Sequence, residues 1–85
     1  SGRAGLLRNA AIVLGNRGDQ SAVPVLKRVL SDTEPLIRGA AAWALGQLGE
    51  TETLDSLAAQ LSVERESSVR LELQQAITSI KASGK

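Results

Sequence analysis

An internal repeat constrains the fold of this chain more than any other feature of its 85 residues. Residues 6–19, LLRNAAIVLGNRGD, align with residues 37–50, IRGAAAWALGQLGE, at a shift of 31 that superposes both glycines and most apolar positions. A third, incomplete copy starts at residues 68–80, SVRLELQQAITSI, at a shift of 32. Units of this length bury a shared core by stacking on their neighbours. The chain is therefore expected to contain roughly two and a half stacked units.

Each unit is expected to form two helices. Apolar residues of the second copy recur every three or four positions, which predicts one buried stripe on a helix. Pro24 and Pro35 fit the first turns of helices, where a missing N–H costs little. The predicted helices span residues 5–16, 21–31, 35–47, 52–62 and 67–81. The predicted fold class is all-α, a right-handed α-solenoid of helical hairpins with five helices.

The whole chain, 1–85, is predicted to be one repeat domain. The first repeat is assigned to residues 5–33, the second to 35–65 and a half repeat to 67–81, with flexible ends at 1–4 and 82–85.

Two Gly-x-x-Gly pairs are predicted to end the first helix of each repeat and to supply left-handed backbone at the turn. The pairs are Gly15 with Gly18 and Gly46 with Gly49. A β-sheet, or Gly15 and Gly46 in the middle of helices, would contradict this interpretation.

The half repeat has no second helix of its own. Leu73, Ile77 and Ile80 are therefore expected to lie uncovered, and self-association through this open C-terminal end is predicted.

Composition argues against several functional classes. The chain contains neither cysteine nor histidine, so it holds no thiolate ligand, thiol nucleophile or imidazole base. No apolar run approaches the ~20 residues of a membrane span, and no secretory leader is recognisable. The chain is expected to be noncatalytic and cytoplasmic, without a metal, a cofactor or a membrane partner. Its charge is uneven: residues 1–42 carry six basic and three acidic groups (+3), and residues 43–85 carry four and six (−2).

These segments resemble HEAT-like repeat arrays, for which IRGAAAWALGQLG followed by an acidic residue is a strong match. More narrowly, LLRNAAIVLGNRGD (6–19) and PLIRGAAAWALGQLG (35–49) resemble the carboxyl-terminal repeat domain of the epoxyqueuosine reductase family. That family reduces epoxyqueuosine to queuosine in tRNA with a cobalamin and iron–sulfur clusters. Because clusters need cysteines, the resemblance implies an accessory role here, either in docking tRNA or in bracing the catalytic domain.

Five basic or polar residues in the first half of the chain are candidates for contact with RNA phosphates: Arg8, Asn9, Arg17, Lys27 and Arg28. Phosphate contacts position an RNA without reading its sequence. The alternative is a merely solvated surface, since aromatic residues for base stacking are missing.

Trp43 is the only aromatic residue in the chain. Ile12, Trp43 and Leu71 are predicted to form an apolar band that docks a protein partner. In the alternative interpretation, the indole covers Gly39, packs on Leu71 and completes the core. A general protein–protein scaffold without any role in RNA binding is the second hypothesis for function.

Charged residues at the turns are expected to link successive repeats. By analogy with HEAT-like arrays, Asp19 should pair with Arg38, and Glu50 with Arg70. Glu34 and Glu66 also lie four residues before these arginines, at the spacing of a helical ion pair.

Overall fold

The computed structural model describes residues 2–83, and their regular structure is entirely helical. Five α-helices follow one another, with a 3-10 turn before the second (Gln20–Ala22) and another before the fourth (Thr51–Thr53). The helices are α1 (Gly2–Arg17), α2 (Val23–Val29), α3 (Pro35–Leu48), α4 (Leu54–Val63) and α5 (Ser67–Ser83). The predicted all-α repeat fold with five helices is confirmed.

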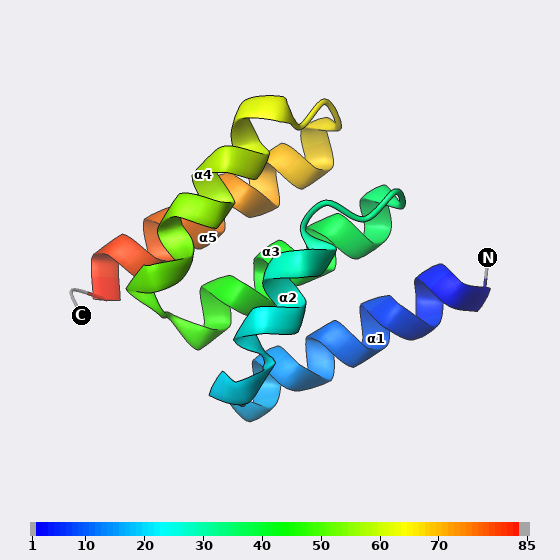
Figure 1. The fold of residues 1–85 in the computed structure, drawn as a ribbon, viewed down its shortest axis with the longest axis horizontal. Coiled ribbons are helices and arrows are strands. Elements are labelled where there is room, and N and C mark those ends of the chain that lie inside the picture. The colour runs from blue at the N-terminus through cyan, green and yellow to red at the C-terminus, as the bar shows by residue number, and fades with distance from the viewer. Residues whose placement is uncertain (1, 84–85) are drawn as a thin grey trace.

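The helices form two layers (Figure 1). The first helices of the repeats, α1, α3 and α5, lie side by side, and α3 packs on both neighbours. The second helices form the other layer, in which α2 covers α3 and α4 covers α5. No helix in the described part of the chain is both long and apolar enough to cross a membrane.

The core is centred on α3, because this helix has neighbours on three sides. Ala41, Ala42, Ala44 and Leu45 of α3 are completely buried. Small side chains on α3 let the adjacent helices approach closely, since the distance between helix axes depends on side-chain size. Larger residues from the other helices fill the remaining space, among them Leu26, Leu57, Leu73 and Ile80.

The two glycines of each Gly-x-x-Gly pair have different roles, so the prediction for them is half wrong. Gly18 and Gly49 adopt left-handed backbone, with φ of +66° and +73°, and they follow the last residues of α1 and α3. Gly15 and Gly46 are instead buried inside the last turns of these helices. The helices therefore continue past Gly15 and Gly46, but they end two residues later, at Arg17 and Leu48, just before the second glycine of each pair.

Gly15 and Gly46 allow the backbones of neighbouring helices to come into close contact, α1 with α3 and α3 with α5. A Cβ atom built at Gly46 would lie 3.0 Å from Cα of Ala76 in α5. A Cβ atom at Gly15 would lie 3.0 Å from Cα of Ala44 and 2.8 Å from Cζ3 of Trp43. Glycine is therefore required at these two positions by close packing of the helices and not by a turn.

Residues 2–4 and 82–83, which were predicted to belong to flexible ends, are helical. α1 already begins at Gly2, because Ala4 is buried and Nη2 of Arg3 lies 2.7 Å from Oδ2 of Asp32. α5 likewise continues through residues 82 and 83. Residues 1, 84 and 85 of the expected ends lie outside the described residues.

The C-terminal half repeat is not open in the way predicted. Leu73 and Ile80 are completely buried, and Ile77 is half-buried against the core. These residues lie on the side of α5 that packs against the rest of the fold, and α4 supplies the cover that the third repeat lacks. Leu71, at 53% exposed, is the large apolar residue that α5 leaves in solvent.

Candidate functional site

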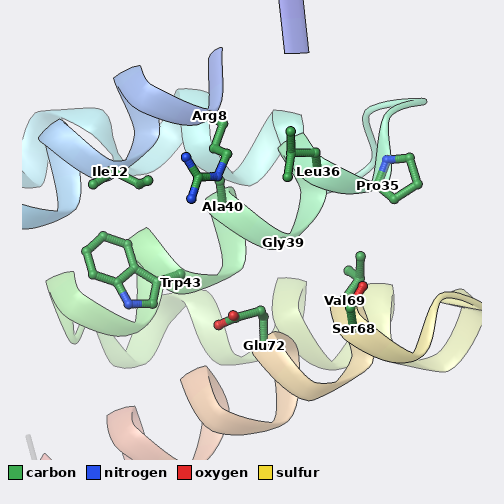
Figure 2. A pocket seen from close by; sticks show the side chains of 10 residues that line it. All are labelled: Arg8, Ile12, Pro35, Leu36, Gly39, Ala40, Trp43, Ser68, Val69 and Glu72. Atoms are coloured by element: carbon green, nitrogen blue, oxygen red, sulfur yellow. The ribbon is translucent and has the colours of Figure 1, made fainter. Parts of the chain in front are cut away.

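A groove of about 480 Å³ crosses the layer formed by α1, α3 and α5. Figure 2 shows Arg8 and Ile12 of α1 on one side, Trp43 of α3 near one end and Glu72 of α5 on the opposite wall. The full lining consists of Arg8, Ile12, Pro35, Leu36, Gly39, Ala40, Trp43, Ser68, Val69 and Glu72. Apolar side chains dominate, with one cation and one anion on facing walls. A mostly apolar groove with few polar groups is the usual composition of a binding site.

The structure brings Ile12 and Trp43 together but separates Leu71 from them. Ile12 and Trp43 are half-buried and line the same groove, whereas Leu71 points away from it into solvent. The predicted band of three residues is therefore limited to two.

The indole of Trp43 packs on a different glycine from the one expected. Its Cζ3 atom lies where Gly15 of α1 leaves room, 2.8 Å from a Cβ position there. A Cβ at Gly39 would instead meet the side chains of Glu72 and Val69, at 3.8 and 3.9 Å. The indole leans toward α1, and Gly39 remains as open floor of the groove.

The five candidate RNA-contacting residues are divided between the two layers. Arg8 lines the groove on the α1 side, and its Nη1 donates a long hydrogen bond, 3.4 Å, to Oδ1 of the exposed Asn9. Arg17 is exposed in the last turn of α1. Lys27 and Arg28 belong to α2, where they line a second groove beside Gln20, Pro24 and Glu52. The structure therefore joins only Lys27 and Arg28 in one concavity.

The candidate cations are not neutralised by carboxylates. Among residues 2–83, ion pairs within 4.0 Å are formed only by Arg3 with Asp32 and by Arg38 with Glu64. Arg8, Arg17, Lys27 and Arg28 thus keep their charges available to an external anion.

The predicted ion pairs of Asp19 with Arg38 and of Glu50 with Arg70 are not formed within the described residues. Arg38 pairs with Glu64, with Nε to Oε1 and Nη2 to Oε2 both at 2.8 Å, instead of Asp19. Arg70 donates from Nη1 to the carbonyl oxygens of Leu61 and Glu64, at 2.9 and 3.1 Å, instead of to Glu50. Within the described residues, neither Glu34 nor Glu66 forms an ion pair with the arginine four residues later.

The carboxylate of Asp19 forms hydrogen bonds within its own turn, which explains why it does not bind Arg38. Its carboxylate caps the 3-10 turn by accepting from the backbone N–H of Ser21 at 3.1 Å, and the Ser21 hydroxyl also donates to it. These hydrogen bonds lower the pKa of Asp19 below its ordinary value.

Glu64 is a buried carboxylate that sequence reasoning missed. Its side chain is 1% exposed, and it also accepts hydrogen bonds from Gln60 Nε2 and from the backbone N–H of Glu66. The Arg38 guanidinium is the main cause that lowers the pKa of Glu64 from 4.5 to about 2. The available signal was the repeat itself, because Glu64 and Glu66 follow Asp32 and Glu34 at the shift of 32.

Metal ligands do not converge in the described part of the chain, where no group of three acidic, histidine or cysteine side chains is placed to hold an ion. Glu50, Glu52 and Asp55 are close in sequence, and acids in that position suit the positive end of a helix.

Sequence comparisons place most of the chain in one family. Residues 3–78 match the family described as HEAT repeats. An epoxyqueuosine reductase from Bacillus subtilis (strain 168) is 37% identical over 84 residues, which cover 98% of this chain and 22% of that protein. A deoxyhypusine hydroxylase from Danio rerio is 43% identical over 54 residues, 61% of this chain and 18% of that protein.

A solved structure shows the same architecture. The crystal structure of an epoxyqueuosine reductase with a tRNA-Tyr epoxyqueuosine-modified stem loop superposes with a TM-score of 0.84 at 36% identity. The superposition covers 87% of this chain and 20% of that one. The chain spans about a fifth of the length of these relatives. With matching helices, matching repeats and a family match over residues 3–78, this chain belongs to the HEAT-repeat family.

Proposed function

We propose that this chain is a noncatalytic helical-repeat part of an epoxyqueuosine reductase-like protein, and that it helps to dock the anticodon stem loop of a tRNA. The similarity to a reductase structure that contains a tRNA stem loop carries the proposal. The reductase chemistry would then belong to other parts of the protein, and the proposal places the protein in the cytoplasm with its tRNA.

The distribution of charge supports contact with phosphates. Lys27 and Arg28 of α2 share one groove, and neither pairs with a carboxylate within the described residues. An unpaired ammonium and an unpaired guanidinium side by side attract a polyanion and release its counterions on binding. Arg17, Arg8 and Asn9 are further candidates for phosphate contact, but they belong to α1, in the other layer of helices. Such contacts would hold the stem loop in place without selecting its sequence.

The experiment is a titration of the chain with an anticodon stem loop at two salt concentrations. Removing two phosphate contacts with the double variant Lys27→Ala/Arg28→Ala should weaken binding and reduce the slope of log K against log salt by about 2. The matched control is Arg65→Ala/Lys81→Ala, which removes the same charge from two exposed residues of the second half. Equal weakening by both variants, or no binding by the parent chain, would remove the RNA role.

Bracing of a catalytic domain is the second candidate function. It is favoured by the groove across α1, α3 and α5, because an apolar lining with Ile12 and Trp43 suits a protein segment better than a phosphate backbone. Gly39 forms its floor, so Gly39→Leu would fill the groove from a helix that stays intact. Loss of catalytic activity in a full-length reductase carrying the equivalent change, with stem-loop affinity unchanged, would support bracing over RNA docking.

A further inference from the structure

The groove beside α2 contains hydrogen-bond acceptors as well as cations. It has a volume of about 550 Å³ and lies between α2, in the first repeat, and the 3-10 turn before α4, in the second. Both of its walls therefore belong to this chain. Lys27 and Arg28 of α2 supply two cations, and Gln20 and Glu52 of the two 3-10 turns supply acceptor oxygens. A phosphate group alone would use only the cations.

The side-chain amide of Gln20 is held in place by its nitrogen. Its Nε2 donates a hydrogen bond of 3.2 Å to the carbonyl oxygen of Leu48, the last residue of α3. A carbonyl oxygen can only accept, so this bond determines which end of the amide is the nitrogen. Within the described residues, the Oε1 atom of Gln20 accepts no hydrogen bond, and it is therefore available to a ligand in the groove.

Glu52 is an exposed carboxylate that shares the groove with two cations and pairs with neither. Among residues 2–83, no ion pair within 4.0 Å engages its side chain. A carboxylate repels the phosphates that Lys27 and Arg28 attract, so it weakens the binding of a ligand that offers phosphates alone. A ligand that also carries a hydroxyl group offsets this repulsion, because O–H donors form strong hydrogen bonds with carboxylates.

We propose that this groove binds the ribose–phosphate backbone of RNA. Lys27 and Arg28 contact a phosphate, and Glu52, assisted by Gln20, accepts a hydrogen bond from a neighbouring ribose 2′-hydroxyl. The inference rests on the proposed function and adds to it a means of selecting RNA over DNA, since the 2′-hydroxyl is the group that distinguishes the two at a given contact. Neither contact touches a base, so the selection is by sugar and not by sequence.

Two stem loops that differ only at the 2′ position test the proposal. One is an RNA anticodon stem loop, and the other has the same sequence with 2′-fluoro groups, which keep the A-form geometry but donate no hydrogen bond. The chain should bind the hydroxyl form about tenfold more tightly, as expected for one hydrogen bond to a charged acceptor. Glu52→Ala should remove most of this preference, partly by tighter binding of the fluoro form.

Asp55→Ala is the matched control. It removes the same charge from an exposed residue of α4 that does not line the groove, so it should leave the ratio of the two affinities unchanged. Glu52 is also exposed, and circular dichroism verifies that both variants keep their helices. Gln20 is left in place because its amide also binds Leu48.

The outcomes separate this inference from the proposed function. Equal binding of both stem loops by the parent chain would overturn the 2′-hydroxyl contact and leave RNA docking in place. An unchanged ratio in Glu52→Ala, or an equal loss of preference in Asp55→Ala, would have the same meaning. Absence of binding to either stem loop would instead remove the proposed function, and this inference with it.

Discussion

Asp32 and Glu64 occupy the same place in two successive repeats, 32 residues apart, and each carboxylate binds an arginine from the first helix of its own repeat. Arg3 donates to Asp32 and Arg38 donates to Glu64. Each acid also accepts the N–H of the residue two positions later, Glu34 or Glu66. The arginine of the following repeat then binds the carbonyl of the same acid, Arg38 at Asp32 and Arg70 at Glu64. This acidic residue therefore binds the first helix of its own repeat through its carboxylate, and the first helix of the next repeat through its carbonyl oxygen.

Substitution of Glu64 by glutamine should destabilise the fold. The Arg38 side chain is 15% exposed and that of Glu64 is 1% exposed, so the variant leaves a guanidinium without its counter-ion in a partly desolvated site. Loss of one partner of such a pair lowers the free energy of unfolding by roughly 2 to 4 kcal/mol. Urea denaturation measures the change. Glu66→Gln, at an exposed position, should leave the midpoint in place, and an unchanged midpoint for Glu64→Gln would contradict the expected role.

Stability should fall in acid because of the same residue. The pKa of Glu64 is about 2 in the folded chain and 4.5 ordinarily, so its contribution is present above pH 4.5 and is lost as the pH falls toward 2. A difference of this size corresponds to roughly 3 kcal/mol. Urea denaturation at several pH values gives the slope of the free energy of unfolding against pH. Glu64→Gln should flatten it only in part, since the pKa values of Asp19 and Asp32 are also lowered, by Ser21 and Arg3.

Gly46→Ala should destabilise the chain although alanine favours helices. The added methyl group would lie 3.0 Å from Cα of Ala76, a backbone atom that cannot move aside without separating α3 from α5. Overpacking of this kind costs about 1 to 3 kcal/mol. Gly39→Ala is the matched control on the same helix, because its methyl group meets only side chains at 3.8 and 3.9 Å. The control should gain up to about 1 kcal/mol from helix propensity, so thermal unfolding should shift in opposite directions for the two variants.

Gly49→Ala should cost about 1 kcal/mol for a different reason. Gly49 has open space around it but adopts a φ of +73°, which a side chain disfavours. Gly49→Asn should recover part of the loss, because asparagine tolerates left-handed backbone better than alanine. Equal thermal midpoints for the alanine and asparagine variants would contradict the argument from conformation.

Repeat alignment predicted the number, order and approximate limits of the helices, because each repeat supplies the same apolar pattern to the same interfaces. It also assigned the helix-ending turns correctly at Gly18 and Gly49. It failed at Gly15 and Gly46, since a glycine needed for a turn and a glycine needed for close packing look alike in sequence. The buried state of Leu73 and Ile80 was missed because α4 covers α5, although α4 belongs to the preceding repeat.

The candidate site was less predictable than the fold. Ile12 and Trp43 were correctly expected on one surface, because they align in successive repeats. Leu71 aligns with Gly39 instead, and it is exposed because no described helix packs on that face of α5. Arg8 lies apart from Lys27 and Arg28 because α1 and α2 belong to different layers of helices. The charge composition of the sequence does not predict this separation. Arg38 binds Glu64 instead of Asp19, and this depends on where α4 ends, since Glu64 directly follows its last residue.

The contact between Trp43 and Gly15 gives the chain a spectroscopic sensor. Because the indole leans from α3 toward α1 and is the only aromatic side chain of the chain, its emission reports on the packing of the helices around α3. If α1 detaches before the remaining helices melt, emission will shift to longer wavelength while most of the circular dichroism signal persists. The order in which the solenoid unravels can thus be followed without attaching a label.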